Sequence, residues 1–469
     1  MRLDFPLDSV VSTLPMSQNA NKKLYIKTWG CQMNSYDSNR MADILRPLGY
    51  KCVDSPVDAD MVILNTCHIR EKATDKVFSD LGRIRPHKDT NKDMLIAVAG
   101  CVAQAEGDYI LERAPYVDMV FGPQTYHELP EMVAKATGAY GKNRIVNTDF
   151  PSESKFDFLP EEQNVQGAAA FLSIQEGCDK FCTFCVVPYT RGAEYSRSVN
   201  EVLNEAHNLV QRGAKEITLL GQNVNAFHGE GPDGTVWGLG RLIRAVAEID
   251  GLERIRYTTS HPRDMDDDLI DTHRDIHKLM PFLHLPVQSG SDGILEAMNR
   301  KHTGDDYRRI VDKLRAARPD LALSSDFIVG FPGETEEDFQ ETLRLVRDVG
   351  YASAYSFKYS ARPGTPGANM KNLVRDNVAD ERLARLQALI NEQQRAFNAR
   401  SAGIVMPVLF DRKGKKSGQL LGRSPWNQSV YANGPDRLLN QIIDVKVTEG
   451  FDNSLTGIIE TSEALSKTV

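Results

Sequence analysis

The stretch Glu176-Gly177-Cys178-Asp179-Lys180-Phe181-Cys182-Thr183-Phe184-Cys185 directly follows the apolar run Phe171–Gln175. Three thiolates spaced C-x3-C-x2-C can wrap three corners of a cubic [4Fe–4S] cluster. No fourth cysteine is near in sequence, so one iron is left open for a substrate or cofactor, as at a catalytic metal site. The alternative is a zinc site completed by a histidine. Neither His207 nor His127 has the short spacing of a zinc knuckle.

This stretch follows the first of several apolar runs that alternate with helical patterns over residues 169–398. Six strands with intervening helices predict a barrel or a (βα)6 partial barrel whose site lies at the carboxyl ends of the strands. The predicted strands are Phe171–Gln175, Glu216–Leu220, Arg254–Thr258, Phe282–Leu285, Ala322–Ile328 and Ala354–Lys358.

The same alternation over residues 23–140 predicts a separate doubly wound, parallel α/β domain. Residues 1–22 show no clear period and are expected to form a mobile arm. Residues 141–168 are polar, and we interpret them as a linker. The predicted strands of the domain are Leu24–Thr28, Met61–Leu64, Met94–Ala99 and Val117–Phe121.

Cys31, Cys67 and Cys101 are too far apart in sequence for a local metal knuckle, yet each follows one of these strands. In a parallel doubly wound sheet such positions share one edge, so the three cysteines are expected to converge. Gly30 and Gly100 would permit tight turns or the close approach of a bulky cluster. The alternative is three buried structural cysteines.

After residue 399 the pattern changes to short strands, which predicts a small β-barrel over 399–463 and a tail over 464–469. Residues 400–423 hold six basic residues against one acidic residue, and Trp426 and Tyr431 lie near them. Basic side chains interleaved with aromatics suit an RNA backbone and unstacked bases, although a solvated surface is the alternative. The candidate RNA-binding residues are Lys413, Lys415, Lys416, Arg423 and Trp426.

Composition limits the function further. The chain has 469 residues, seven cysteines and a formal net charge of −8. A polycationic surface and a disulfide scaffold are excluded, so any nucleic-acid site must be a local patch. No apolar run is long enough to span a membrane and the N-terminus does not read as a signal peptide, which points to a reducing cytosol. The seventh cysteine, Cys52, is interpreted as a core residue.

The C-x3-C-x2-C motif with an aromatic residue before its third cysteine resembles the radical S-adenosylmethionine (radical SAM) superfamily. That resemblance implies that the amine and carboxylate of SAM chelate the open iron at Cys178, Cys182 and Cys185. An electron from the cluster then cleaves SAM to a 5′-deoxyadenosyl radical. The protein orients the cofactor and excludes water.

Both cysteine groups together resemble the methylthiotransferases over residues 22–463. The resemblance implies two [4Fe–4S] clusters, one in each group, and an RNA-binding TRAM domain at the C-terminus. Within that family four motifs look like the MiaB-type tRNA enzymes. They are Gly30-Cys31-Gln32-Met33-Asn34, Asn65-Thr66-Cys67-His68-Ile69-Arg70-Glu71-Lys72-Ala73, Gly221-Gln222-Asn223-Val224-Asn225 and Lys416-Ser417-Gly418-Gln419-Leu420-Leu421-Gly422-Arg423.

By the same resemblance, Gln222 and Asn223 lie near the methionine end of SAM, although a polar turn is the alternative. Gln288 and Ser289 are expected to line the SAM or substrate site, and Phe184 accompanies the cysteines. The run Arg300-Lys301-His302 could meet phosphate or be a solvated charge run. Asp326-Phe327-Ile328-Val329-Gly330-Phe331-Pro332-Gly333-Glu334-Thr335 resembles the superfamily strand that packs against adenine.

The resemblance implies that the protein adds a methylthio group to C2 of N6-isopentenyladenosine at position 37, beside the anticodon of tRNA. SAM would serve as methyl donor and radical source, an electron-donor protein would be needed, and a monomer is expected. Two enzyme alternatives share the scaffold: action on threonylcarbamoyladenosine in tRNA, or on an aspartate of a ribosomal protein. An iron–sulfur RNA-binding redox sensor is the non-enzyme alternative.

Overall fold

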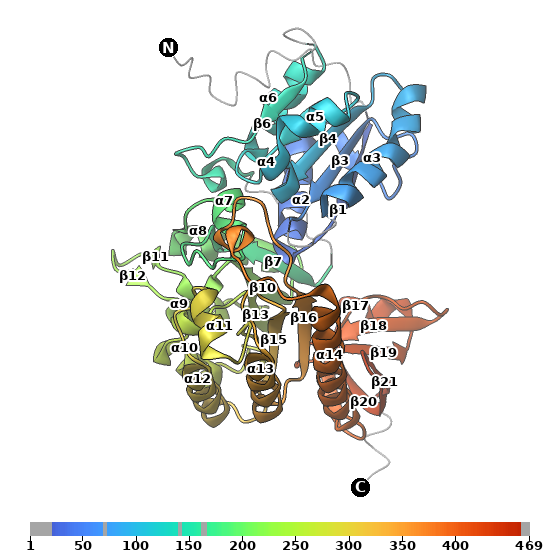
Figure 1. Ribbon diagram of the computed structural model, residues 1–469. Helices are drawn as coiled ribbons and strands as arrows, with labels where there is room; N and C mark the ends of the chain where they lie inside the picture. The colour runs from blue at the N-terminus through green and yellow to red at the C-terminus, as the bar shows by residue number, and fades with distance from the viewer. Residues whose placement is uncertain (1–20, 69–72, 139–142, 161–166, 461–469) are drawn as a thin grey trace. The chain divides into compact units, whose positions relative to one another are not determined.

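The computed structural model describes residues 21–68, 73–138, 143–160 and 167–460 (Figure 1). The expected N-terminal arm and C-terminal tail lie almost entirely outside these residues. The chain divides into two compact units, each described by itself. The first holds residues up to 164 together with 186–193, and the second holds 165–185 and 194–469.

The first unit is built on a six-stranded sheet with the order β2-β1-β3-β4-β5-β6, in which all neighbours are parallel. Each face of the sheet packs against its own apolar core, which is why β3 and β4 are buried along their whole lengths. This confirms the predicted doubly wound α/β domain. The strands are β1 (Lys22–Thr28), β2 (Tyr50–Cys52), β3 (Met61–Thr66), β4 (Leu95–Gly100), β5 (Met119–Phe121) and β6 (Ile145–Asn147).

Helices cover both faces of this sheet. Residues 101–113 form two helices, because Gly107 turns the chain with a φ of 42°. The helices of the unit are α2 (Gln32–Leu45), α3 (Ala73–Thr90), α4 (Cys101–Glu106), α5 (Asp108–Arg113), α6 (Leu129–Ala136) and α7 (Val187–Arg191), with 3-10 turns at Arg46–Leu48, Tyr126–Glu128 and Lys155–Phe158.

Three expectations for this unit differ from the structure. Strands β2 and β6 were not predicted, since each is only three residues long and lies at an edge of the sheet. Because β6 pairs with β5, part of the expected linker 141–168 belongs to the first unit. Cys52 is exposed at the end of β2, so its interpretation as a core residue was wrong.

The second unit begins with six parallel strands that follow one another in space as in sequence, in two three-stranded sheets. The two sheets are joined where Ile255 of β13 forms backbone hydrogen bonds with the segment just before β14. This is the partial barrel expected from the alternation. The strands are β7 (Ala169–Ser173), β10 (Glu216–Leu220), β13 (Arg254–Thr258), β14 (Phe282–His284), β15 (Ala322–Val329) and β16 (Ser353–Lys358).

Helices pack on the outside of these strands around one large apolar core. Ser198, Thr303 and Thr335 begin three of them with capping boxes, which satisfy the free backbone N–H groups of the first turn. The helices are α8 (Val199–Gln211), α9 (Leu239–Ala247), α10 (Asp267–Asp275), α11 (Asp292–Ala297), α12 (Gly304–Ala317), α13 (Glu336–Val349) and α14 (Asp376–Ala399). Two short hairpins complete this part: β8 (Gln175–Glu176) with β9 (Tyr195–Ser196), and β11 (Gly229–Glu230) with β12 (Val236–Trp237).

A closed five-stranded barrel ends the unit, with the order β17-β18-β19-β21-β20. Its interior is apolar, which agrees with the predicted small β-barrel. No helix among the described residues is long and apolar enough to cross a membrane. The strands are β17 (Val405–Lys413), β18 (Gln419–Arg423), β19 (Ser429–Asn433), β20 (Ile442–Gly450) and β21 (Leu455–Ile459).

Candidate iron–sulfur sites

Cys31, Cys67 and Cys101 lie at the carboxyl ends of β1, β3 and β4, which are neighbours in the sheet. Cys31 caps α2 and Cys101 begins α4. The predicted convergence of three distant cysteines on one sheet edge is therefore confirmed.

Glycines make room for this convergence. A Cβ atom on Gly30, whose φ is 102°, would lie 2.2 Å from Cys67 Cβ and 2.6 Å from its Sγ. A Cβ atom on Gly100, whose φ is 87°, would lie 2.4 Å from the carbonyl oxygen of Thr66. Both positions thus require glycine for conformation and for space, as the sequence predicted.

The three thiols share one electrostatic environment. The hydrogen bond from Cys67 and the nearby Arg191 guanidinium lower the pKa of Cys31 to about 6, against the opposing effect of burial. Burial raises the pKa of Cys101, and Arg191 opposes that rise. A buried cation beside clustered thiols favours thiolates, the form that binds iron.

Arg191 is held in place by a buried network. Its guanidinium donates to Asp37 Oδ2 at 2.6 Å and to Asn34 Oδ1 at 3.0 Å. Asn34 in turn donates to the carbonyl oxygens of Trp29 and Thr66, at the ends of β1 and β3. Sequence reasoning missed Arg191, whose only signal is its place six residues after Cys185.

Cys178, Cys182 and Cys185 lie on the loop after β7 and β8, at the carboxyl end of the partial barrel. The Cys185 N–H donates to the Cys182 carbonyl oxygen at 2.9 Å, which closes a tight turn. Phe181, which lies between Cys178 and Cys182 in the sequence, has a φ of 46°. This conformation is rare for a bulky residue and is frequent in functional loops.

Gln222 and Asn223, which were predicted to lie near SAM, interact with residues that hold this cysteine loop in place. Gln222 Oε1 accepts the Gly177 N–H at 2.7 Å. Asn223 Nδ2 donates to Asp264 Oδ2 at 2.8 Å, and Lys180 of the loop pairs with the same carboxylate. The Asn223 side-chain oxygen is buried and accepts no hydrogen bond in the described structure. These residues support the cysteine loop directly.

Arg300 contacts this cysteine group. It is 5% exposed, and its Nη1 donates to Cys182 Sγ at 3.5 Å while Nη2 donates to the carbonyl oxygen of Pro286. His302 is half-buried, and this desolvation, with the nearby Arg300, lowers its pKa to about 4. The charge run 300–302 is therefore not solvated as a whole, and Arg300 is aimed at a cysteine sulfur.

The two groups of three cysteines suit iron–sulfur clusters better than single metal ions. Within the described ranges, no three or more Cys, His, Asp or Glu side chains converge closely enough to hold a single metal ion. A cubic [4Fe–4S] cluster binds each thiolate at a different iron, so its ligands need not meet at one point. Two groups of three cysteines, each with a buried arginine at a thiol, fit such anionic groups.

The other predicted cofactor residues lie in different surroundings. Gln288, with a φ of 81°, bridges to β15: its N–H donates to Asp326 O and its carbonyl accepts from Ile328 N. Phe184 packs against the apolar cluster of Ile294, Met298 and Phe331. The Ser289 hydroxyl instead lies 3.2 Å from Thr342 Oγ1 on α13, an outer helix.

The candidate RNA residues divide into two sets. Lys413, Lys415 and Lys416 are exposed at the hairpin between β17 and β18, where Lys413 pairs with Asp436. Arg423 is partly buried and donates to the carbonyl oxygen of Asn427 and to Ser429 Oγ. Trp426 donates its indole N–H to the carbonyl oxygen of Asp320 and so also contacts the partial barrel.

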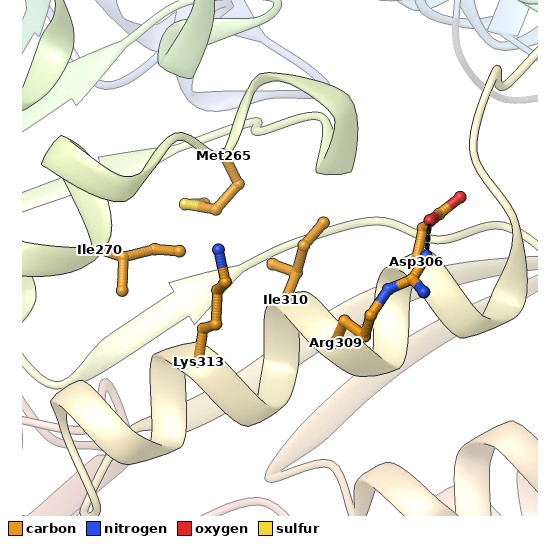
Figure 2. A pocket seen from close by; sticks show the side chains of 6 residues that line it. All are labelled: Met265, Ile270, Asp306, Arg309, Ile310 and Lys313. Atoms are coloured by element: carbon orange, nitrogen blue, oxygen red, sulfur yellow. Dashed lines mark hydrogen bonds and ion pairs between the residues drawn. The ribbon is translucent and has the colours of Figure 1, made fainter.

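One surface pocket has none of the candidate site residues in its lining. Figure 2 shows its mixed lining of apolar and charged side chains around α12. Lys313 on its rim pairs with Asp267 of α10 at 2.7 Å. The pocket is lined by Met265, Ile270, Asp306, Arg309, Ile310 and Lys313.

Comparisons with known proteins agree with this architecture. Residues 23–122 match "Uncharacterized protein family UPF0004", and residues 172–346 match the Radical SAM superfamily. A tRNA-2-methylthio-N(6)-dimethylallyladenosine synthase from Jannaschia sp. (strain CCS1) is 60% identical over 436 residues, covering 93% of this chain and 94% of that protein.

Solved structures show likeness of fold. The radical SAM methyltransferase TsrM from Kitasatospora setae superposes with a TM-score of 0.55 at 14% identity, covering 74% of this chain and 75% of that one. The cobalamin-dependent radical SAM enzyme OxsB gives 0.52 at 15% identity, covering 79% and 56%. Radical SAM enzymes use SAM and a [4Fe–4S] cluster. Because the 60% identical relative matches over 93% of the chain, the chain belongs to the tRNA-2-methylthio-N(6)-dimethylallyladenosine synthase family of radical SAM enzymes.

Proposed function

We propose that this protein adds a methylthio group to C2 of N6-isopentenyladenosine at position 37 of tRNA. The observation that carries the proposal is the full-length match at 60% identity to a synthase of that name, in a chain with both cysteine groups. tRNA and SAM are then its substrates. An electron-donor protein, a monomeric state and a cytoplasmic location belong to the same proposal.

Cys178, Cys182 and Cys185 would hold the cluster that works with SAM. When bound, that cluster supplies the electron for reductive cleavage of SAM, the chemistry of the superfamily. The chain's own residues orient the loop: Gln222 fixes Gly177, and Lys180 is tied to Asp264. Asn223, Gln288 and Phe184 are the proposed contacts of SAM.

Cys31, Cys67 and Cys101 would hold a second [4Fe–4S] cluster that carries or delivers sulfur. Their common sheet edge, the glycines that make room beside them and the buried Arg191 support this assignment. Cys52 is exposed at the end of a strand that carries none of them, which makes it a matched control.

We further propose that residues 399–463 form a TRAM domain that binds tRNA. The hairpin with Lys413, Lys415 and Lys416 presents exposed positive charge on an otherwise acidic chain. Such charge would contact the phosphate backbone and give salt-dependent affinity. The domain arrangement is then a sulfur-cluster domain that includes β6, a radical SAM domain over 169–398 and this barrel.

The decisive experiment combines a metal count with a product assay. The anaerobically reconstituted chain should hold roughly eight irons, and replacing Cys31, Cys67 and Cys101 with Ala should remove about half, whereas Cys52→Ala should remove none. Incubation with isopentenylated tRNA, SAM and a reductant should give the 2-methylthio nucleoside by mass spectrometry. Product only from threonylcarbamoylated tRNA or from a ribosomal protein, or no cleavage of SAM, would refute the proposal.

A further inference from the structure

The inner face of the sheet β14-β15-β16 carries polar and aromatic side chains. Parallel pairing sets His284 beside Ser324 and Asp326 beside Tyr355, and alternation puts all four on the same face. The opposite face holds Leu283, Leu323 and Phe327, which are buried in the core shared with the outer helices. The first set therefore faces the inside of the partial barrel.

The exposure of this inner face is unusual. The strands of parallel sheets covered by helices are normally buried on both sides. Here Tyr355 is 60% exposed, and the Asp326 side chain is 30% exposed. An exposed tyrosine ring beside an exposed carboxylate offers a ligand both an apolar surface and a hydrogen-bond acceptor.

His284 organises the two groups. Its Nδ1 lies 3.1 Å from Ser324 Oγ, and its Nε2 lies 3.5 Å from Asp326 Oδ2. Its ring meets Tyr355 edge-on, with the centroids 6.4 Å apart. The imidazole thus contacts both the aspartate and the tyrosine, while the pairing of β15 with β16 sets Asp326 beside Tyr355.

This face is continuous with the cysteine site. Gln288 pairs with β15 between Asp326 and Ile328. Ile328 and Phe184 of the cysteine loop both pack against one small apolar cluster, which consists of Ile294, Met298 and Phe331. A ligand on Asp326 and Tyr355 therefore lies two residues along β15 from Ile328, which shares an apolar cluster with the cysteine loop. This is a suitable place for the atom that the radical chemistry must reach.

The two arginines of β13 are already paired with other groups. Arg256 pairs with Glu216 at 3.0 Å and donates to the carbonyl oxygens of Ser424 and Pro425. Arg254 likewise donates to carbonyl oxygens of the β-barrel. Neither is free to balance the charge of an anionic ligand beside Asp326.

We propose that Tyr355, His284 and Asp326 bind the adenine base with its apolar N6 substituent and select against acidic substrates. The inference rests on the proposed function. Tyr355 packs on the base and its isopentenyl chain, and Asp326 accepts the N6–H. Threonylcarbamoyladenosine and a protein aspartate both carry a carboxylate, which Asp326 repels.

The test measures the affinity of the cluster-loaded protein for three tRNAs that differ only at position 37: unmodified, isopentenylated and threonylcarbamoylated. Tyr355→Ala should weaken binding of isopentenylated tRNA about tenfold, as expected for a lost base–aromatic contact. Unmodified tRNA, which presents the base without the isopentenyl chain, should lose a smaller part of its affinity. Asp326→Asn should tighten binding of threonylcarbamoylated tRNA about fivefold by removing like-charge repulsion.

Two controls keep the result interpretable. Tyr355→Phe keeps the ring and should bind like the parent, and Tyr109→Ala removes an exposed tyrosine of the other unit and should change nothing. Unchanged binding by Tyr355→Ala, or equal weakening for all three tRNAs, would overturn the inference. Failure of the parent protein to make the methylthio product would instead refute the proposed function.

Discussion

Arg300 should raise the reduction potential of the cluster held by Cys178, Cys182 and Cys185. Its guanidinium is buried and lies 3.5 Å from Cys182 Sγ. Reduction adds negative charge to the cluster, and a nearby cation stabilises the reduced state. Replacing Arg300 with Gln should therefore shift the potential to more negative values.

The magnitude follows from the distance. Two unit charges about 4 Å apart interact by about 4 kcal/mol at an effective dielectric constant of about 20. The added electron is spread over the whole cluster, so about a quarter to a half of that energy applies, or about 1 to 2 kcal/mol. For a one-electron couple this is a shift of about 45 to 90 mV.

The assay is a redox titration of the reduced-cluster electron paramagnetic resonance signal. A background lacking Cys31, Cys67 and Cys101 isolates one cluster. Arg300→Lys keeps the charge and should shift the potential much less, and Arg263→Gln removes an exposed cation nearby and should shift it hardly at all. Equal potentials in the parent and Arg300→Gln, with equal iron content, would refute the electrostatic role of Arg300.

Three further predictions concern the second unit. Arg382→Met should lower the free energy of unfolding by about 3 kcal/mol, because it leaves the buried Glu334 carboxylate, now 2.8 Å from Arg382, without its ion-pair partner. Urea titration measures this loss, and the additional substitution Glu334→Gln should restore part of it. Burial lowers the pKa of His273 from 6.5 to about 3, so stability is full above pH 6.5 and falls as the pH drops towards 3, by up to about 1.4 kcal/mol per pH unit. Thermal unfolding of His273→Gln across that window should show a flatter dependence, and an unchanged slope would contradict the assignment. Arg256→Ala should speed proteolytic cleavage between α14 and β17, since it removes hydrogen bonds to the β-barrel; an unchanged cleavage rate would mean that other contacts dock the barrel.

The convergence of the first cysteine group was predictable because it follows from topology. Parallel strands all end at one edge of a sheet, so a cysteine after each of β1, β3 and β4 must meet the others. The glycines before Cys31 and Cys101 added a local signal, and the positive φ values of Gly30 and Gly100 bear it out. Periodicity also located every strand of the partial barrel.

What the sequence could not reveal depends on distant contacts. Arg300 meets Cys182 across more than a hundred residues, and no spacing rule connects them. Strands β2 and β6 are too short to show a period, and they form only because β1 and β5 offer them an edge. Cys52 alternates like a core residue, but it lies at the open edge of the sheet, where that side is exposed.

Each cysteine group has one buried arginine, and the two arginines are balanced differently. A [4Fe–4S] cluster with three thiolates carries a net negative charge, and burying it without a partner is costly. Arg191 also pairs with Asp37, so that charge is partly neutralised in the protein alone. Arg300 has no carboxylate within ion-pair distance in the described part of the chain, and its contacts are a thiol and a carbonyl oxygen. The loop of Cys182 therefore depends more on its cluster for charge balance than the sheet edge of Cys31 does.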